Sequence, residues 1–425
     1  MDGTRYKEAR LSGGLRVGTA WMPWMRSACL GIYAGVGSRH EAAPLAGLAH
    51  FAEHMLFKGT PTRSPLAITQ AVEGVGGQIN AFTAEDHTAY HAQVPAEFWR
   101  EAGAVLADLY GHSLFPEQEI EREREVILEE IVMYREQPSQ HIEDLHAEAM
   151  WPGSSLGRPV AGEEATVQRI AREDLEGFVS GGYFGPDTVI SLAGPVDHEE
   201  VVDFFEAAFS DCRLQERPAK KMDALAQAPS HEEEVRPDLD QTHLALGFRG
   251  PGRLSEGRFA FRLLSILLGE TMSSRLFQRL REQEGLCYQI STDTEVFDEA
   301  GLLQIYAGVD QRKVERTLDL LGEELRRIAS EAPGEEEFGQ ALRYALGQHA
   351  LAQESTYHQF SWVAESLQVH DRIVDPEETA ARLAQVRRED LQALAADIFD
   401  RAHLGSAVIG RALGSQGISS RLGLP

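Results

Sequence analysis

His50, Glu53 and His54 have the side chains and the spacing to hold a metal ion and to use it. Each residue of a helix turns the chain by about 100°, so these three positions share one face of a helix that spans them. Two imidazoles one turn apart lie about 5–6 Å from each other and can bind one zinc ion. The order H-x-x-E-H inverts the commoner H-E-x-x-H zinc motif and places Glu53 to act on a water molecule.

The helix that must carry this group is predicted over 45–57. Its opposite face is apolar and needs a core, because it gathers Leu45, Leu48, Ala52, Met55 and Leu56. A pattern of five residues also arises by chance. A cluster of solvated side chains that binds no metal therefore stays open as an alternative at this point.

A second helix could complete the metal site. It is predicted to begin at Pro116 and to end near Gln137, before Pro138. The buried stripe expected for it consists of Ile120, Ile127, Ile131 and Tyr134. Glu123 and Glu130 lie on the border of that stripe, where a carboxylate is costly unless it is paired or bound to a cation. The alternative is that both glutamates simply extend to solvent.

Composition limits the class of protein. A length of 425 residues exceeds one typical core and indicates two to three domains. The net charge of −27 argues against nucleic acid as a partner and would suit a basic peptide, although acidity also serves solubility. The cysteines Cys29, Cys212 and Cys287 are sparse and odd in number, so any metal must use histidine and carboxylate.

The sequence contains no apolar run of the length that crosses a bilayer, so no membrane partner is expected. Its first residues lack the apolar segment of a secretory signal. We therefore expect a cytoplasmic protein.

Strands are predicted around the two helices. The segments 15–21 and 27–35 flank Pro23 and indicate an antiparallel hairpin. The segments 78–83 and 88–94 follow, the first as an edge strand. His87 and His91 lie about 13 Å apart if they sit on a strand, too far to share one ion, so we interpret them as structural. His141 and His146, five residues apart, are a poor metal pair and are interpreted as surface residues.

The order of elements in the first half recurs in the second half without a histidine pair. We predict an α+β fold of two homologous α/β halves, each an antiparallel-rich sheet covered by helices, joined by a linker. The N-terminal zinc-binding catalytic domain spans 1–212, the linker 213–238, and the C-terminal domain, which has no metal site, 239–425. One metal site per chain is expected.

The stretch from His50 to Thr60, HFAEHMLFKGT, closely resembles the pitrilysin family, which includes insulin-degrading enzyme and mitochondrial processing peptidase, and especially its processing-peptidase-like branch. That family's third zinc ligand is a glutamate at the distance at which Glu130 follows His54. A second glutamate of the family, which supports the site, matches Glu123. The resemblance implies a clam-like pair of halves that encloses peptides.

Two further stretches resemble the family. Residues 77–83 resemble the edge strand that binds the substrate backbone, which implies substrate contacts from Asn80, Ala81 and Phe82. Residues 274–288 resemble the signature of the C-terminal half, and Arg281 and Tyr288 match the pair that reaches the substrate. From the residues alone, this arginine and tyrosine could be merely structural.

These observations predict a zinc metalloendopeptidase for unfolded peptides or presequence-like segments. One Zn²⁺ per chain is held by His50, His54 and Glu130. The residues expected to be catalytic are Glu53, Glu123, Arg281 and Tyr288. The alternatives are a non-catalytic scaffold or partner subunit, and a structural or storage zinc module without hydrolysis. Expected partners are peptides, in particular basic ones, and either a second copy or a related subunit in a dimer.

Overall fold

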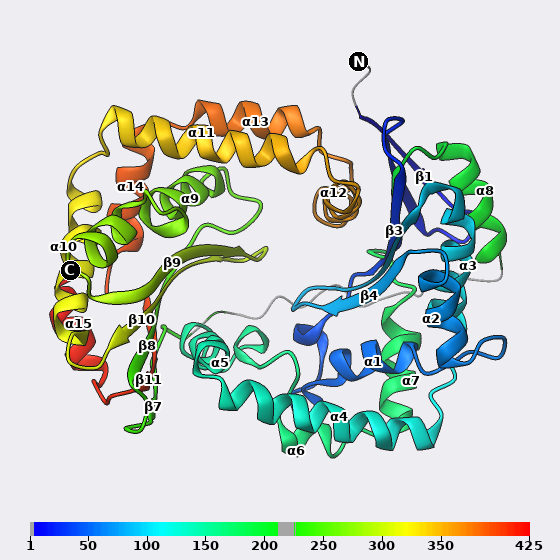
Figure 1. The fold of residues 1–425 in the computed structure, drawn as a ribbon, viewed down its shortest axis with the longest axis horizontal. Helices are drawn as coiled ribbons and strands as arrows, with labels where there is room; N and C mark the ends of the chain where they lie inside the picture. The colour runs from blue at the N-terminus through cyan, green and yellow to red at the C-terminus, as the bar shows by residue number, and fades with distance from the viewer. Residues whose placement is uncertain (1–3, 211–224, 226) are drawn as a thin grey trace. The chain divides into compact units, whose positions relative to one another are not determined.

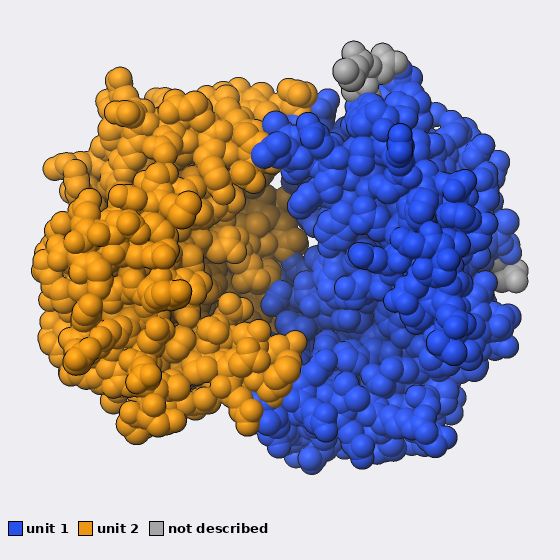
Figure 2. All heavy atoms as spheres, viewed as in Figure 1, with its two compact units in different colours: residues 1–132, 158–221, 350–376 blue, residues 133–157, 222–349, 377–425 orange. Residues whose placement is uncertain are grey.

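The computed structural model describes residues 4–210, 225 and 227–425. The chain forms two compact units (Figure 2). As far as the structure describes them, unit 1 comprises Met1–Val132, Arg158–Lys221 and Ala350–Pro376, and unit 2 comprises Met133–Gly157, Met222–His349 and Glu377–Pro425. Each unit holds one sheet with helices packed against it, which confirms the predicted α+β fold of two similar halves.

Unit 1 is built on a six-stranded sheet in the order β1-β2-β6-β3-β5-β4. Figure 1 labels β1, β3 and β4 of this sheet. Its strands are β1 (Arg5–Arg10), β2 (Arg16–Trp21), β3 (Ser27–Ala34), β4 (Gln78–Thr83), β5 (Thr88–Pro95) and β6 (Val189–Gly194). Its helices are η1 (Ser38–His40), η2 (Ala43–Leu45), α1 (Leu48–Leu56), α2 (Pro65–Glu73), η3 (Ala96–Phe98), α3 (Trp99–His112), α4 (Glu117–Glu136, whose end belongs to unit 2), α6 (Glu164–Val167), α7 (Arg172–Gly182), α8 (His198–Ala208) and α12 (Thr356–His370).

The central strands of this sheet are buried on both faces, and β3 shows why. Its even-numbered residues, such as Leu30 and Ile32, join the larger core that also takes in apolar residues of α1, α3 and α4. Its odd-numbered residues Cys29 and Tyr33 join a second core beneath α12. Because side chains alternate along a strand, a strand that is apolar on both faces supplies both cores at once.

Unit 2 is built on a five-stranded sheet in the order β7-β11-β8-β10-β9. Its strands are β7 (His231–Val235), β8 (Gln241–Gly250), β9 (Cys287–Val296), β10 (Gly301–Asp310) and β11 (Leu404–Gly410). Its helices are α5 (Pro138–Met150), η4 (Ser155–Gly157), α9 (Arg258–Ser265), the π-helices η5 (Ile266–Glu270) and η6 (Phe277–Gln283), α10 (Val314–Ser330), α11 (Glu335–Ala352), α13 (Pro376–Gln385), α14 (Arg388–Ile398) and α15 (Ser415–Leu422). In sheet order, these five strands correspond to β2-β6-β3-β5-β4 of unit 1. Both sheets include one parallel pair, β7 with β11 in unit 2 and β2 with β6 in unit 1.

Each unit takes one helix from the opposite half of the chain. Helix α12, from the second half, packs on β2, β3 and β6 of unit 1, and α5, from the first half, packs on β7, β8 and β11 of unit 2. Glycines allow this close approach: a Cβ on Gly18 would lie 2.4 Å from Val363 of α12, and one on Gly247 would lie 2.4 Å from His146 of α5. The packed units therefore differ from the contiguous segments 1–212 and 239–425.

The structure corrects several expectations. Strands β2 and β3 are not a hairpin, because β6 lies between them and pairs with both. The predicted linker 213–238 lies partly outside the described residues and contains strand β7, whose five residues carry few apolar side chains because it is an edge strand. Tyr134 is 37% exposed, unlike the other three residues of its predicted stripe. His146 is buried, because it faces the sheet of unit 2.

Within the described part of the chain, no helix is both long enough and apolar enough to span a bilayer. Cys29 and Cys287 are free and buried, and Cys212 lies outside the described residues.

Candidate metal centre

Helix α1 begins at a tightly fitted backbone turn. Gly47 precedes it with a φ of 95°, a left-handed conformation that suits glycine, and a Cβ there would lie 2.6 Å from the carbonyl oxygen of Ala161. The buried carboxylate of Glu41 accepts hydrogen bonds from the backbone N–H groups of Gly47 at 2.9 Å and Ala49 at 2.6 Å. These contacts fix the start of the helix, because its first N–H groups have no partner within the helix.

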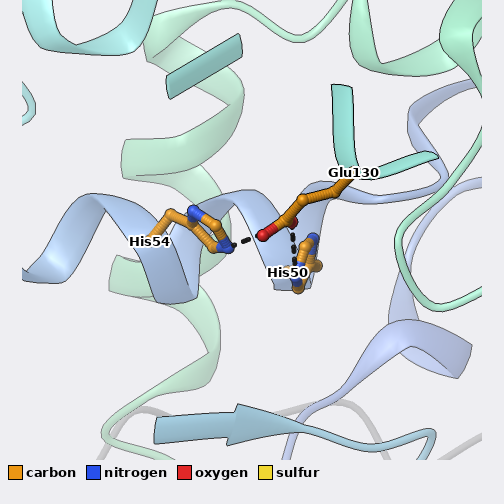
Figure 3. A group of neighbouring side chains, drawn as sticks. All are labelled: His50, His54 and Glu130. Atoms are coloured by element: carbon orange, nitrogen blue, oxygen red, sulfur yellow. Dashed lines mark ion pairs between the residues drawn. The ribbon is translucent and has the colours of Figure 1, made fainter. Parts of the chain in front are cut away.

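Residues on two helices of unit 1 converge into one group. His50 and His54 lie one turn apart on α1, and Glu130 reaches them from α4 (Figure 3). The Oε2 atom of Glu130 lies 3.9 Å from Nε2 of His50 and 3.7 Å from Nε2 of His54. In the described ranges this is the only group of at least three histidine, cysteine or acidic side chains whose ligand atoms lie within 4.8 Å of one another.

The geometry of this group fits a metal ion better than direct contact. The two glutamate–histidine distances are too long for hydrogen bonds. Tetrahedral zinc with bonds of about 2.0–2.2 Å would place its ligand atoms about 3.4 Å apart, close to what is observed. Glu130 Oε2 is buried and has no hydrogen-bond partner, a costly state that a cation would relieve. Two histidines and one carboxylate are also a typical catalytic zinc set with an open fourth position.

Glu53 lies on the same face of α1, between the two histidines in sequence. Its Oε2 accepts a hydrogen bond of 2.6 Å from the hydroxyl of Thr83, the last residue of β4. Burial raises the pKa of Glu53, and the hydrogen bond from Thr83 and the nearby His54 oppose this rise. A carboxylate with a raised pKa can take up and release a proton closer to neutral pH.

Glu123 connects His54 to a lysine. Its Oε2 lies 3.0 Å from Nδ1 of His54, and its Oε1 lies 2.5 Å from Nζ of Lys58. If Nδ1 carries the proton, Nε2 of His54 is free to bind the metal, as expected for a histidine ligand held from behind. Burial raises the pKa of Glu123, but the hydrogen bonds from His54 and Lys58 outweigh this and the net pKa is lowered.

The two histidines differ in electrostatics in the metal-free chain. Burial, together with the neighbouring His54, lowers the pKa of His50 to about 4. Burial also lowers the pKa of His54, but the hydrogen bond to Glu123 and the charges of Glu130 and Glu53 leave it raised. His50 is therefore neutral at physiological pH, which is the form that binds a metal.

The predicted substrate strand is the free edge of the sheet of unit 1. Strand β4 pairs with β5 on one side only. The side chain of Asn80 is exposed, and its Oδ1 accepts a hydrogen bond of 2.9 Å from the N–H of Ala81. Phe82 packs edge-on against His87 and His91 in an aromatic cluster beneath α12. Substrate contacts from Asn80, Ala81 and Phe82 remain predictions.

Other histidines and the second-half residues take the following positions. His87 stacks on Tyr33, and His91 contacts Phe360, so the pair is part of the aromatic packing as expected. Arg281 and Tyr288 lie in unit 2, where the guanidinium carbon of Arg281 is 5.9 Å from the centre of the Tyr288 ring. The Tyr288 side chain is 77% exposed. A catalytic role for this pair stays a prediction.

Three supporting residues were missed by sequence reasoning: Glu41, Lys58 and Thr83. Lys58 follows His54 by four residues, so a helical register could have placed it near Glu123 on the same side. Thr83 could have been linked to Glu53 only by knowing that β4 passes α1. Glu41 lies in a loop, where no periodicity gives a side-chain direction.

Two helices of unit 1 thus bring an H-x-x-E-H group and a distant glutamate together, on a framework repeated in unit 2. This combination defines the class of inverted zinc-motif proteins. Family models match both parts of the chain: residues 18–164 match "Insulinase (Peptidase family M16)", and residues 169–344 match "Peptidase M16 inactive domain". The chain belongs to the M16 peptidase family.

Similar proteins support this assignment. The chain is 36% identical over 401 residues to an uncharacterized zinc protease of Streptomyces coelicolor, which covers 93% of this chain and 87% of that protein. It is 33% identical over 358 residues to an uncharacterized zinc protease of Bacillus subtilis, over 84% of this chain and 86% of that protein. The fold is similar to the crystal structure of a Helicobacter pylori protease, with a TM-score of 0.88, 19% identity, and coverage of 96% of this chain and 100% of that one.

Proposed function

We propose that the protein is a zinc-dependent endopeptidase that hydrolyses unfolded peptides or presequence-like segments. The observation that carries this proposal is the convergence of His50, His54 and Glu130 with Glu53 beside them. A structural zinc module would explain the three ligands but not a carboxylate next to the open position. The relatives named zinc proteases give independent support.

The metal would be Zn²⁺, one per chain, held by His50, His54 and Glu130. Bound there, it supplies Lewis acidity and lowers the pKa of a water molecule toward neutrality. Glu53 accepts the proton of the attacking water and returns it to the leaving amine. Glu123 holds His54 in the orientation and tautomer that metal binding requires. Arg281 and Tyr288 are proposed to contact the substrate carbonyl.

An extended peptide would bind by adding a strand to the free edge of β4. Backbone hydrogen bonds of this kind give affinity with little dependence on sequence, which suits a peptidase for unfolded chains.

The net charge of −27 would favour basic peptides by long-range attraction. Cleavage of a peptide library at low and high salt tests this preference. An absence of both a salt effect and an excess of Arg or Lys near the cleavage site would contradict it.

The test of the function is zinc content measured together with cleavage of a quenched peptide by the purified chain. The wild-type protein is expected to bind one zinc per chain and to cleave. Glu53→Gln is expected to keep the zinc and to lose about 10²- to 10⁴-fold in rate. Glu129→Gln is the matched control, because Glu129 neighbours the ligand Glu130 on α4 but is absent from the metal group.

Two outcomes would contradict the proposal. A wild-type chain that binds zinc but cleaves no peptide would favour a scaffold role, or a subunit that needs a partner. A chain that cleaves equally well after Glu53→Gln would exclude the assigned base.

Native mass spectrometry of the same sample tests the proposed dimer, either of two copies or with a related subunit.

A further inference from the structure

Thr83 joins the edge strand of unit 1 to the candidate base. It is the last residue of β4, and its hydroxyl lies 2.6 Å from Oε2 of Glu53. Within the described residues, this is the only hydrogen bond to the Glu53 side chain. A carboxylate only accepts hydrogen bonds, so the threonine is the donor. When Glu53 is ionised, this bond is stronger than one between neutral groups.

The alternation of β4 explains why Thr83 faces α1. Ile79 and Ala81 pack against the larger core of unit 1, to which α1 also contributes. Thr83 is two residues further along the strand and therefore points to the same face. Phe82 lies between them in sequence and packs on the opposite face, in the aromatic cluster with His87.

The backbone at Thr83 is held on both sides. In the strand pairing it lies opposite Thr88 of β5. In the turn that follows, Ala84 N–H donates to the carbonyl oxygen of His87 at 2.8 Å, and the Ala84 carbonyl oxygen accepts from Ser38 N–H at 3.1 Å. The segment of Ser38 leads into α1. The hydroxyl of Thr83 is thus presented by a fixed piece of backbone rather than by a free loop end.

We propose that Thr83 is a positioning residue for the reaction. Its hydroxyl holds Oε2 of Glu53 and leaves Oε1 to exchange protons with water and the leaving amine. The strand that would receive a peptide and the side chain that would act as base are then aligned by one hydrogen bond. This inference rests on the proposed peptidase function and deepens it.

The experiment compares Thr83→Val, Thr83→Ser and wild type. Valine keeps the shape and the branching suited to a strand but removes the donor, whereas serine keeps the donor. Thr83→Val is expected to lower kcat about 10- to 100-fold, because a small misplacement of a reacting group has an effect of that size. KM and zinc content are expected to stay at wild-type values. Thr83→Ser is expected to recover most of kcat.

Thr294→Val is the matched control, since Thr294 lies on β9, the edge strand of unit 2, and is expected to leave kcat unchanged. Crystal structures of wild type and Thr83→Val give a readout independent of activity. The Glu53 carboxylate of Thr83→Val is expected to be displaced from its position in the wild-type structure. An unmoved carboxylate, an unchanged kcat, or a loss of zinc together with kcat would each overturn the inference. An inactive wild type would instead reject the proposed function, and the crystal structures would still decide the role of Thr83 in holding Glu53.

Discussion

Helices α1 and α9 occupy corresponding places in two similar units but differ in the side chains that they carry. Both follow the strand that lies third from the free edge of its sheet, β3 in unit 1 and β8 in unit 2. Helix α1 leaves His50, Glu53 and His54 partly exposed beside its buried apolar face. Helix α9, with the sequence RFAFRLLS, contains no histidine or carboxylate, and most of its residues are buried.

The difference locates the candidate chemistry on one copy of a repeated framework. Sheet order, the parallel strand pair and the covering helix recur in both units. What differs is one polar stripe on one helix and the glutamates that face it from α4. The framework therefore does not create the site; it holds two helices at a distance at which a few polar substitutions can bind a metal.

The largest expected effect concerns α12 and α5, the two helices that each pack in the unit of the opposite half of the chain. Phe360→Ala in α12 and Ile142→Ala in α5 each remove a fully buried side chain and should lower the free energy of unfolding by about 2–5 kcal/mol. Phe360→Ala is expected to accelerate amide hydrogen exchange in β2, β3 and β6, and Ile142→Ala in β8 and β11. Faster amide hydrogen exchange of unit 2 in Phe360→Ala, or of unit 1 in Ile142→Ala, would contradict this placement of the two helices.

The next effect concerns the proposed metal ligands of unit 1. His54→Ala should weaken zinc binding about 10²- to 10³-fold, because each ligand contributes a few kcal/mol to a zinc site. His87→Ala is the control, since His87 has the same spacing to His91 but lies in an aromatic cluster. Competition with a chelator measures both affinities. Similar losses from both variants would mean that helical spacing does not select the site.

The third effect is a pH dependence of unit 2. Burial lowers the pKa of His146 to about 4 in the folded protein, from about 6.5 in the unfolded chain. The unfolded chain then binds more protons, so stability is present above pH 6.5 and is lost as pH falls toward 4, by about 3 kcal/mol. In His146→Gln the loss of stability across that range should be smaller by this amount in denaturant titrations. An unchanged pH profile would show that His146 protonates without cost.

The smallest effect concerns Lys58, which supports the candidate metal group of unit 1 through Glu123. Lys58→Met should weaken zinc binding about tenfold by removing the cation that holds Glu123 against His54. Lys58→Arg keeps the charge and should lie closer to wild type. Chelator competition again gives the measurement, with activity per bound zinc as a second value. Equal affinities for all three proteins would limit Lys58 to a surface role.

The predictable part of the molecule followed from periodicity. Helical spacing placed His50, Glu53 and His54 on one face and chose Glu130 rather than Glu129 on α4, as the structure has it. The same reasoning misplaced Tyr134, because the end of α4 extends past the core, which buries the helix as far as Ile131. His146 was assigned to the surface since its pairing with a sheet of the other half of the sequence leaves no local signal.

Strand order and supporting contacts were beyond local reasoning. The insertion of β6 between β2 and β3 depends on pairing across more than 150 residues, which a turn residue such as Pro23 does not reveal. The hydrogen bond from Thr83 to Glu53 likewise depends on the passage of a strand beside a helix. Contacts of this kind arise from tertiary packing, on which a sequence window of one element carries no information.

The helix exchange also has a consequence for synthesis of the chain on the ribosome. The sheet of unit 1 is encoded before residue 195, yet the helix that covers one of its faces ends only at His370. At about 5–20 residues per second, roughly 10–35 s separate the two events. During that interval the sheet face around Tyr33 and Val189 remains uncovered in the nascent polypeptide. Unit 1, which carries the candidate metal site, is therefore completed late in translation and presents an apolar sheet face until then.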